Sequence, residues 1–147
     1  MEKDELIQAI RSSLRKVYRI DEILFRIGVD ERALNHRLAF YLTKLVEQNG
    51  IKVDVEYNRH LVGMKYYEEN KYGSLDILIH ERGTDVNNIC AFECKKEKIS
   101  ETDVVKIRAL LGTEYRYSFG VTIEYVPRNV KLYFKSGSKI IEEKIEL

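Results

Sequence analysis

Residues 74 to 96 constrain the fold most, because they predict two β-strands joined by a polar turn. Side chains of a strand point alternately to opposite faces, so Asp76 lies on the face opposite Ile77. The polar run from Glu81 to Asn88 predicts the turn, and a second apolar strand follows it. These residues therefore predict an antiparallel hairpin.

The hairpin brings charged residues together at one end. Pairing the strands about the midpoint between Thr84 and Asp85 places Asp76 opposite Glu93, with Lys95 on the same face. Opposed residues of an antiparallel pair have Cβ atoms only about 4.5 to 5.5 Å apart. Two carboxylates that close repel each other unless a proton or a cation lies between them. We therefore expect a divalent metal at this end.

This arrangement resembles the active site of the PD-(D/E)XK, or restriction-endonuclease-like, nuclease superfamily. The matching residues are Asp76, Glu93, Cys94 and Lys95, and Leu75 stands where the family usually has proline, a difference that removes no metal ligand. The resemblance implies that the acidic pair binds magnesium and that the lysine orients or activates the attacking water. It also implies hydrolysis of a nucleic-acid phosphodiester.

Glu31 is the candidate for a third carboxylate. Asp30 is predicted to cap a helix that ends near Gly50, and the apolar stripe of that helix leads back through Leu38 to position 31. A charge on an inward stripe needs a partner. Many superfamily members carry a glutamate on this helix, so the resemblance implies that Glu31 reaches the metal. Glu31 could instead be a first-turn carboxylate that the helix dipole favours.

Several further residues could contribute ligands or bind substrate. The main-chain carbonyl of Cys94 could add a metal ligand. Lys71, ahead of the Asp76 strand, and Lys106, on the helix that follows Lys95, could each hold a phosphate. Glu56 could face the site from an earlier strand, and His36 lies about one turn beyond Glu31. Their commoner roles are those of surface residues.

The charge pattern bears on nucleic-acid binding. A net charge of +1 over 147 residues argues for weak and salt-sensitive binding. Arg11, Arg15, Lys16 and Arg19 gather on the first predicted helix, a pattern more typical of a solvated helix face. Residues 64 to 72 interleave tyrosines and lysines, which suits base stacking if they line a groove, although loop tyrosines more often pack.

The remaining pattern predicts the architecture. Ser100 and Asp103 form a capping box for a crossover helix, so the Glu93 strand and the later strand from Tyr117 to Tyr125 should run parallel. We expect an α/β (mixed α+β) fold with a central mixed β-sheet flanked by helices. Its order would be α-α-β-β-β-α-β-β, as in the restriction-endonuclease-like core. Residues 1 to 147 would form a single domain, with 1 to 28 as a helical extension outside the core.

Composition limits the setting. The sequence has no apolar run of some 18 residues and a charged N-terminus, so we expect a cytoplasmic protein without a membrane segment. Cys90 and Cys94 would lie about 13 Å apart on one strand, too far for a disulfide.

The leading hypothesis is a nuclease that depends on Mg²⁺, with Mn²⁺ able to substitute, and whose expected substrate is DNA, with RNA as the alternative. The resemblance also raises the expectation of a homodimer. Two alternatives stay open. The chain could be a module that binds nucleic acid or a protein without cutting, or Asp76, Glu93 and Lys95 could form a purely structural ion-pair network. Divalent-ion affinity separates a metal site from such a network.

Overall fold

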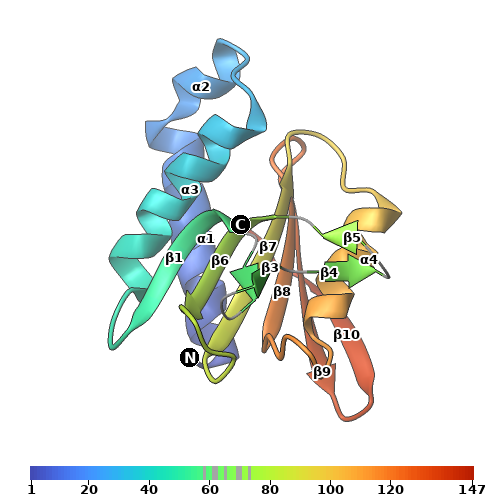
Figure 1. Cartoon of the computed structure of the whole chain (residues 1–147). Helices are drawn as coiled ribbons and strands as arrows, with labels where there is room; N and C mark the ends of the chain where they lie inside the picture. Colours follow the sequence, from blue (N-terminus) through green and yellow to red (C-terminus); the bar gives the residue numbers. More distant parts are fainter. Residues whose placement is uncertain (58, 61–62, 65, 69–70, 73) are drawn as a thin grey trace.

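The computed structural model describes residues 1–57, 59–60, 63–64, 66–68, 71–72 and 74–147, with side chains described outside 58–73 (Figure 1). In this part of the chain, four helices accompany a six-stranded mixed sheet and two short hairpins. The helices are α1 (Lys3–Ile20), α2 (Glu22–Arg26), α3 (Glu31–Val46) and α4 (Glu101–Leu110). The strands of the sheet, in spatial order, are β1 (Ile51–Tyr57), β6 (Leu75–Glu81), β7 (Asn88–Lys95), β8 (Phe119–Glu124), β9 (Asn129–Ser136) and β10 (Lys139–Lys144). The hairpins pair β2 (Arg59–His60) with β3 (Gly63–Met64), and β4 (Tyr66–Glu68) with β5 (Lys71–Tyr72).

The predicted hairpin is β6 and β7, and its register is confirmed. The strands pair antiparallel, with Ile77 opposite Phe92 and Ile79 opposite Cys90. Near the turn an irregularity shifts the register, so that His80 pairs with Asn88. Continuing the regular register toward the other end places Asp76 opposite Glu93. The alternation of apolar and polar residues therefore gave the correct pairing.

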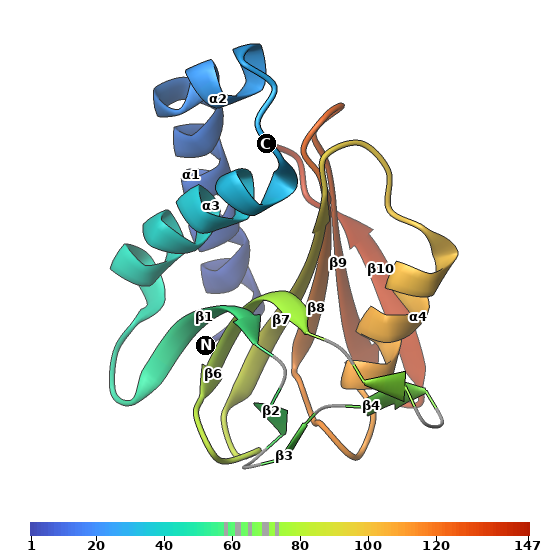
Figure 2. The ribbon, with the colours of Figure 1, turned by 45° about the horizontal axis from the view of Figure 1, so that its top comes forward.

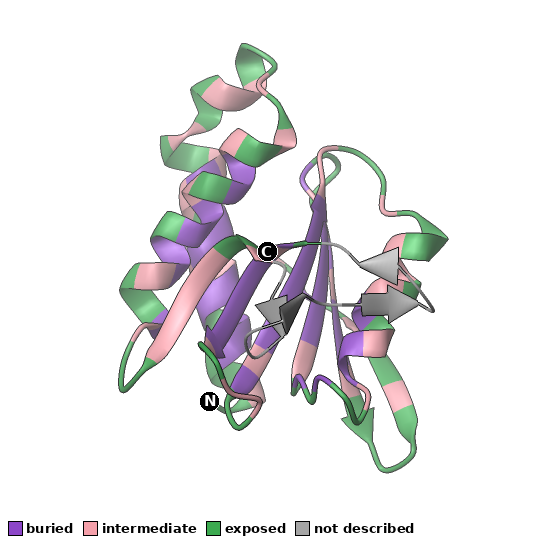
Figure 3. Cartoon of the chain, in the orientation of Figure 1, coloured by how far each residue is buried: buried purple, intermediate pink, exposed green. Residues whose placement is uncertain are grey.

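Helices cover both faces of the sheet (Figure 2). On one face, α1 and α3 pack over a core that includes Ile77, Phe92 and Val121. On the other face, α4 packs over a smaller core that includes Leu78 and Ala91. Figure 3 shows the buried residues concentrated along the central strands and the inner sides of α1 and α3. The expected mixed sheet flanked by helices is thus present.

Helix α1 belongs to the main hydrophobic core. The expectation that residues 1 to 28 extend beyond the restriction-endonuclease-like core stays a prediction. Leu6, Ile10, Leu14 and Val17 are fully buried with the residues of α3 and the sheet. Their spacing of three and four residues places them on one face of the helix. The buried stripe makes α1 an integral layer of the fold.

The crossover after β7 forms as predicted. Ser100 and Asp103 make the capping box at the start of α4, and β7 pairs parallel with β8. The N-cap of α3 is also confirmed, because the Ala33 amide donates a hydrogen bond of 3.2 Å to Asp30 Oδ1. The observed order adds α2, the four short strands β2 to β5 and a final strand, β10, to the expected one. Among the described residues, no helix has the length and apolar character needed to cross a membrane.

Candidate active site

The candidate site lies at the edge of the sheet where β6 begins and β7 ends. Asp76 is the second residue of β6, and Glu93 and Lys95 close β7. The Cys94 amide donates a hydrogen bond of 2.6 Å to Asp76 Oδ2. This bond fixes the Asp76 side chain against the end of β7, so the two strands themselves position the acidic pair.

Glu93 is a buried carboxyl group with a raised pKa. The residue is 4% exposed. Burial, followed by repulsion from Asp76, raises the pKa of Glu93 to about 7, while Lys106 acts in the opposite direction. Its Oε2 atom lies 2.8 Å from the ammonium group of Lys106. Glu93 therefore gains stability from a cation or a proton.

The carboxyl group of Asp76, like that of Glu93, has a raised pKa. Burial is the main cause that raises the pKa of Asp76, and Glu31 adds to it. The hydrogen bond from Cys94 and the charges of Lys106 and Lys95 lower the pKa of Asp76 but do not outweigh burial. Two neighbouring carboxyl groups with raised pKa values are characteristic of sites that hold a cation or exchange a proton.

Lys106 reaches the acidic pair from α4. Its Nζ lies 2.8 Å from Glu93 Oε2, and it donates a hydrogen bond of 2.8 Å to the Ser74 carbonyl. The approach to Glu93 supplies opposite charge and a hydrogen-bonding group at close range. The structure thus brings together Lys106 and Glu93, two of the residues that the sequence singled out.

Lys95 faces Glu31 across the site. Lys95 Nζ lies 3.9 Å from Glu31 Oε1, and each side chain is 34% exposed. Burial lowers the pKa of Lys95, but the carboxyl groups of Asp103, Glu31, Glu93 and Asp76 together raise it above its ordinary value. Lys95 is therefore a firmly protonated ammonium group at neutral pH.

Glu31 is held at the site by the segment that follows β7. The Lys96 amide donates a hydrogen bond of 3.4 Å to Glu31 Oε2, and Lys96 Nζ donates one of 2.8 Å to the Val29 carbonyl. These contacts tie the start of α3 to the end of the strand. Glu31 accordingly turns toward Lys95 and Lys96.

The donor set suits a hard cation with few protein ligands. In the described part of the chain, no three side chains of His, Cys, Asp or Glu assemble as a metal-binding group. Asp76 and Glu93 nevertheless supply two neighbouring carboxyl groups, and Asp76 raises the pKa of Glu93. Mg²⁺ is commonly bound by one or two carboxylates plus waters and substrate phosphates. The acidic pair therefore fits Mg²⁺ without a third carboxylate.

Two of the predicted residues, Glu56 and His36, make no described contact with the acidic pair, and the side chain of a third, Lys71, lies outside the described residues. Glu56 makes an ion pair of 3.1 Å with Arg32 at the surface. His36 is exposed on α3, and the described contacts do not link it to the acidic pair. Lys71 and the other side chains of residues 64 to 72 lie outside the described residues.

Cys94 contributes its backbone amide to Asp76, whereas its thiol is buried and has a pKa that burial raises well above the ordinary value. A metal contact by its carbonyl stays a prediction.

Asp103 is a site neighbour that sequence reasoning assigned only to helix capping. It accepts hydrogen bonds of 2.8 Å from the Ser100 amide and hydroxyl, and its charge also acts on Lys95 and Glu93. The capping-box pattern identifies Asp103 in the sequence only as a helix cap. Its proximity to Lys95 depends on how α4 packs. His80, by contrast, lies 2.9 Å from Asp54 Oδ2 through its Nε2, which places it in a different cluster.

Comparison of the chain with protein-family models, curated proteins and solved structures gives no match.

Proposed function

We propose that the protein is a Mg²⁺-dependent nuclease that hydrolyses phosphodiester bonds in nucleic acid, with DNA as the expected substrate. The proposed fold is restriction-endonuclease-like. The observation that carries the proposal is the acidic pair Asp76 and Glu93, which lies at the edge of the sheet beside two lysines. A carboxylate pair next to ammonium groups is suited to a cation and a phosphate together.

The electrostatics of the pair favours a bound divalent ion. Repulsion from Asp76 and burial both oppose the charge of Glu93. Asp76 and Glu93 would hold Mg²⁺, or Mn²⁺ in its place, and Glu31 would support the site through Lys95. When bound, the ion polarises the phosphate and lowers the pKa of a coordinated water.

Lys95 would act through its charge. Because the surrounding carboxyl groups keep it protonated, it serves as a hydrogen-bond donor to a phosphate oxygen or to the attacking water. Its partial exposure leaves it accessible to a substrate. In this proposal Lys95 steadies negative charge as the phosphodiester bond breaks, and Glu31 keeps its ammonium group in position.

Lys106 would have two states. Without metal, it compensates Glu93 at 2.8 Å. When a divalent ion takes over that role, the flexible lysine side chain can turn to a phosphate oxygen. A lysine that changes its partner from a carboxylate to a phosphate suits a site that must bind both a cation and a polyanion.

A cleavage assay tests the proposal. Labelled single-stranded, double-stranded and branched DNA and RNA are incubated with Mg²⁺, Mn²⁺ or EDTA. We expect metal-dependent cutting that Lys95→Ala and Asp76→Asn each abolish, while circular dichroism shows that both variants remain folded. Lys98→Ala is the matched control, because Lys98 is an exposed lysine close to Lys95 in the chain. Cutting at the wild-type rate by Lys95→Ala or Asp76→Asn would refute the assignment.

A second candidate is a module that binds nucleic acid or a protein without cutting. It is favoured by the ion pair between Lys106 and Glu93, which supplies a cation to the acidic pair without metal. Calorimetric titration with Mg²⁺ and Mn²⁺ separates the two candidates. Tight binding of nucleic acid in EDTA, with no heat from either metal and no cleavage, would support the module.

A further inference from the structure

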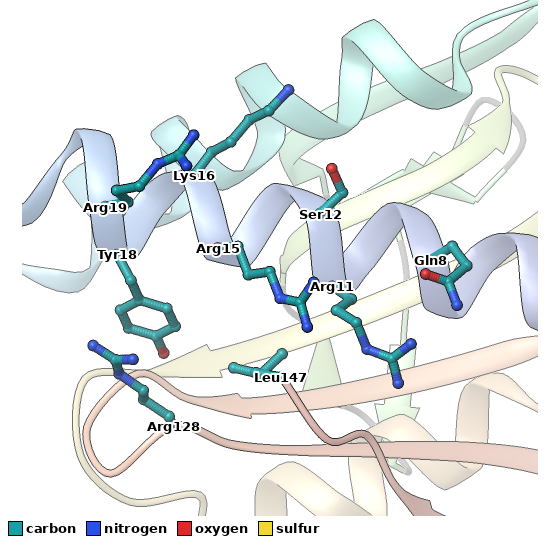
Figure 4. Close-up of a pocket in the computed structure, with 9 residues that line it drawn as sticks. All are labelled: Gln8, Arg11, Ser12, Arg15, Lys16, Tyr18, Arg19, Arg128 and Leu147. Atoms are coloured by element: carbon teal, nitrogen blue, oxygen red, sulfur yellow. The ribbon is translucent and has the colours of Figure 1, made fainter.

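A hollow on the described surface lies along α1, away from the acidic pair. It has a volume of about 590 Å³. Five cationic side chains line it, and no Asp or Glu side chain of the described chain does. We call this hollow the α1 groove; its cations are Arg11, Arg15, Lys16, Arg19 and Arg128 (Figure 4).

Two distant parts of the sequence supply these cations. In Figure 4, Arg11 and Arg15 extend from α1 toward the C-terminal residues, and Arg128 approaches from the turn between β8 and β9. Lys16 and Arg19 extend from the other side of the helix. Successive positions four residues apart on α1 are separated by about 6 Å. One nucleic-acid strand carries a phosphate about every 3.4 Å of its axis, so Arg11 and Arg15, which extend to the same side, are spaced about two phosphates apart.

The cations are available to a ligand. Arg15 and Arg19 are exposed, and neither makes a hydrogen bond or an ion pair within the described residues. Arg11 donates a hydrogen bond only to a backbone group, the Glu146 carbonyl, at 2.7 Å. The Arg128 guanidinium lies 4.2 Å from the centre of the Tyr18 ring. The groove therefore concentrates positive charge that acidic side chains do not neutralise, and it suits a polyanion.

Arg128 has a strained backbone conformation in the turn between β8 and β9. Arg128 has a φ of 71°, in the left-handed region that glycine adopts without strain. A side chain there costs about 1 kcal/mol. Asn49, Glu56 and Arg116 also have a positive φ, so the role of Arg128 rests on its place beside the groove. Arg128 thus places a positive charge beside the groove and lowers the free energy of unfolding.

The turn that carries Arg128 lies at the same end of the sheet as Lys95. β7 and β8 are parallel and pair as far as Lys95 opposite Glu124, so the turn that holds Arg128 leaves the same sheet edge as Lys95. The Tyr125 amide donates to the Lys95 carbonyl at 3.0 Å, and Tyr18 Oη donates to the Tyr125 carbonyl at 2.8 Å. Both bonds involve the backbone of the buried Tyr125, so they fix the start of the β8–β9 turn relative to Lys95 and α1.

We infer that the α1 groove binds the sugar-phosphate backbone of the nucleic acid whose bond lies at the acidic pair. Choosing nucleic acid over other polyanions rests on the proposed nuclease function. The strand would pass from the end of β7 over the β8–β9 turn and along α1. Such contacts depend on the charge of the phosphates and not on the identity of the bases, so the groove would add affinity without sequence preference.

Binding measured without metal tests this inference separately from cleavage. Fluorescence anisotropy with labelled single strands and duplexes, in EDTA, compares wild type with the double variant Arg15→Gln/Arg128→Gln across about 50 to 200 mM salt. The matched control is Lys135→Gln/Lys139→Gln, which removes the same charge from exposed positions at the opposite end of β9. We expect the groove variant to bind at least about tenfold more weakly and its salt slope to fall by roughly two for duplex DNA.

The outcomes separate the two proposals. Groove-dependent binding without cleavage in any metal would support the groove and refute the nuclease. Metal-dependent cleavage with unchanged affinity and salt slope in the groove variant would refute the groove alone. Absence of wild-type binding to nucleic acid, or groove-dependent binding only to vesicles of anionic lipid, would also overturn the inference. Circular dichroism and thermal unfolding confirm that each variant is folded. The further variant Arg128→Gly removes the backbone strain. It should weaken binding while its free energy of unfolding stays within about 1 kcal/mol of the wild-type value.

Discussion

Glu93 illustrates how one buried residue can link a site to the stability of the fold. Its pKa is raised from 4.5 to about 7 in the folded protein, first by burial and then by Asp76. A group that binds its proton more tightly when folded stabilises the protein most below its unfolded pKa, and this contribution is lost as pH rises through the folded pKa. The metal-free protein should therefore lose stability between about pH 5 and pH 8.

The substitution Glu93→Gln should remove this pH dependence, because glutamine does not titrate. In EDTA we expect wild type to lose on the order of 2 kcal/mol more than the variant between about pH 5.5 and pH 8. Urea unfolding at the two pH values measures the difference. Glu97→Gln, at an exposed glutamate, is the control and should behave like wild type. Parallel pH profiles for wild type and Glu93→Gln would contradict the raised pKa.

Lys106 makes a second residue-level prediction, because it competes with a metal for Glu93. Lys106→Met removes the ammonium group 2.8 Å from Glu93 Oε2 and retains much of the side-chain volume. The proposed function then requires tighter Mg²⁺ binding, by roughly tenfold, since one opposite charge no longer has to be displaced. It also requires a lower kcat if Lys106 contacts phosphate during the reaction. Calorimetry and steady-state kinetics report the two effects independently, and a weaker metal affinity would count against competition.

At the level of elements, the docking of α4 on the sheet positions Lys106. A Cβ atom at Gly120 of β8 would lie 2.4 Å from Ile107 Cγ2, so the helix approaches the strand as closely as glycine allows. Gly120→Ala should push α4 outward and cost about 1 to 3 kcal/mol of unfolding free energy. Because Lys106 precedes Ile107, cleavage should fall as well.

A double-mutant cycle checks the cause. Ile107→Leu removes the branched Cγ2 methyl, so Gly120→Ala/Ile107→Leu should recover stability and activity relative to Gly120→Ala. The coupling free energy from urea unfolding should be about 1 kcal/mol or more and favourable. Additive effects would show that the contact between Gly120 and Ile107 does not set the position of α4.

The elements differ in how far the sequence reveals them. The β6–β7 hairpin was predictable because alternation over neighbouring residues fixes both the faces and the pairing of Ile77 with Phe92. The capping box of α4 is equally local. The place of α1 in the core was less accessible, because an apolar stripe shows that a helix packs but not onto what. The partner layer for Ile10 and Leu14 becomes apparent only in the structure.

At the level of the whole molecule, the site combines residues that are near and far in sequence. Asp76 and Glu93 could be paired from the hairpin alone, because their register follows from local alternation. The contact of Lys106 with Glu93 could only be guessed, since it depends on the packing of α4. Arg128 was not anticipated, because it reaches the α1 groove from a turn more than a hundred residues after the arginines of α1. Long-range packing, which leaves no local pattern, accounts for these gaps.

The final prediction concerns the stability of the whole chain in the presence of metal. A ligand that binds only the folded state stabilises it by an amount that depends on its concentration relative to Kd, about 2.7 kcal/mol at 100 times Kd. Near pH 8, where the acidic pair is ionised, saturating Mg²⁺ should therefore raise the Tm by roughly 5 to 10 °C. Near pH 5.5 the effect should shrink, because protons then compete with the ion for Glu93. Differential scanning calorimetry with Mg²⁺, against NaCl of equal ionic strength, measures the shift. Asp76→Asn should abolish it, whereas a shift that persists in this variant would place the ion elsewhere on the molecule.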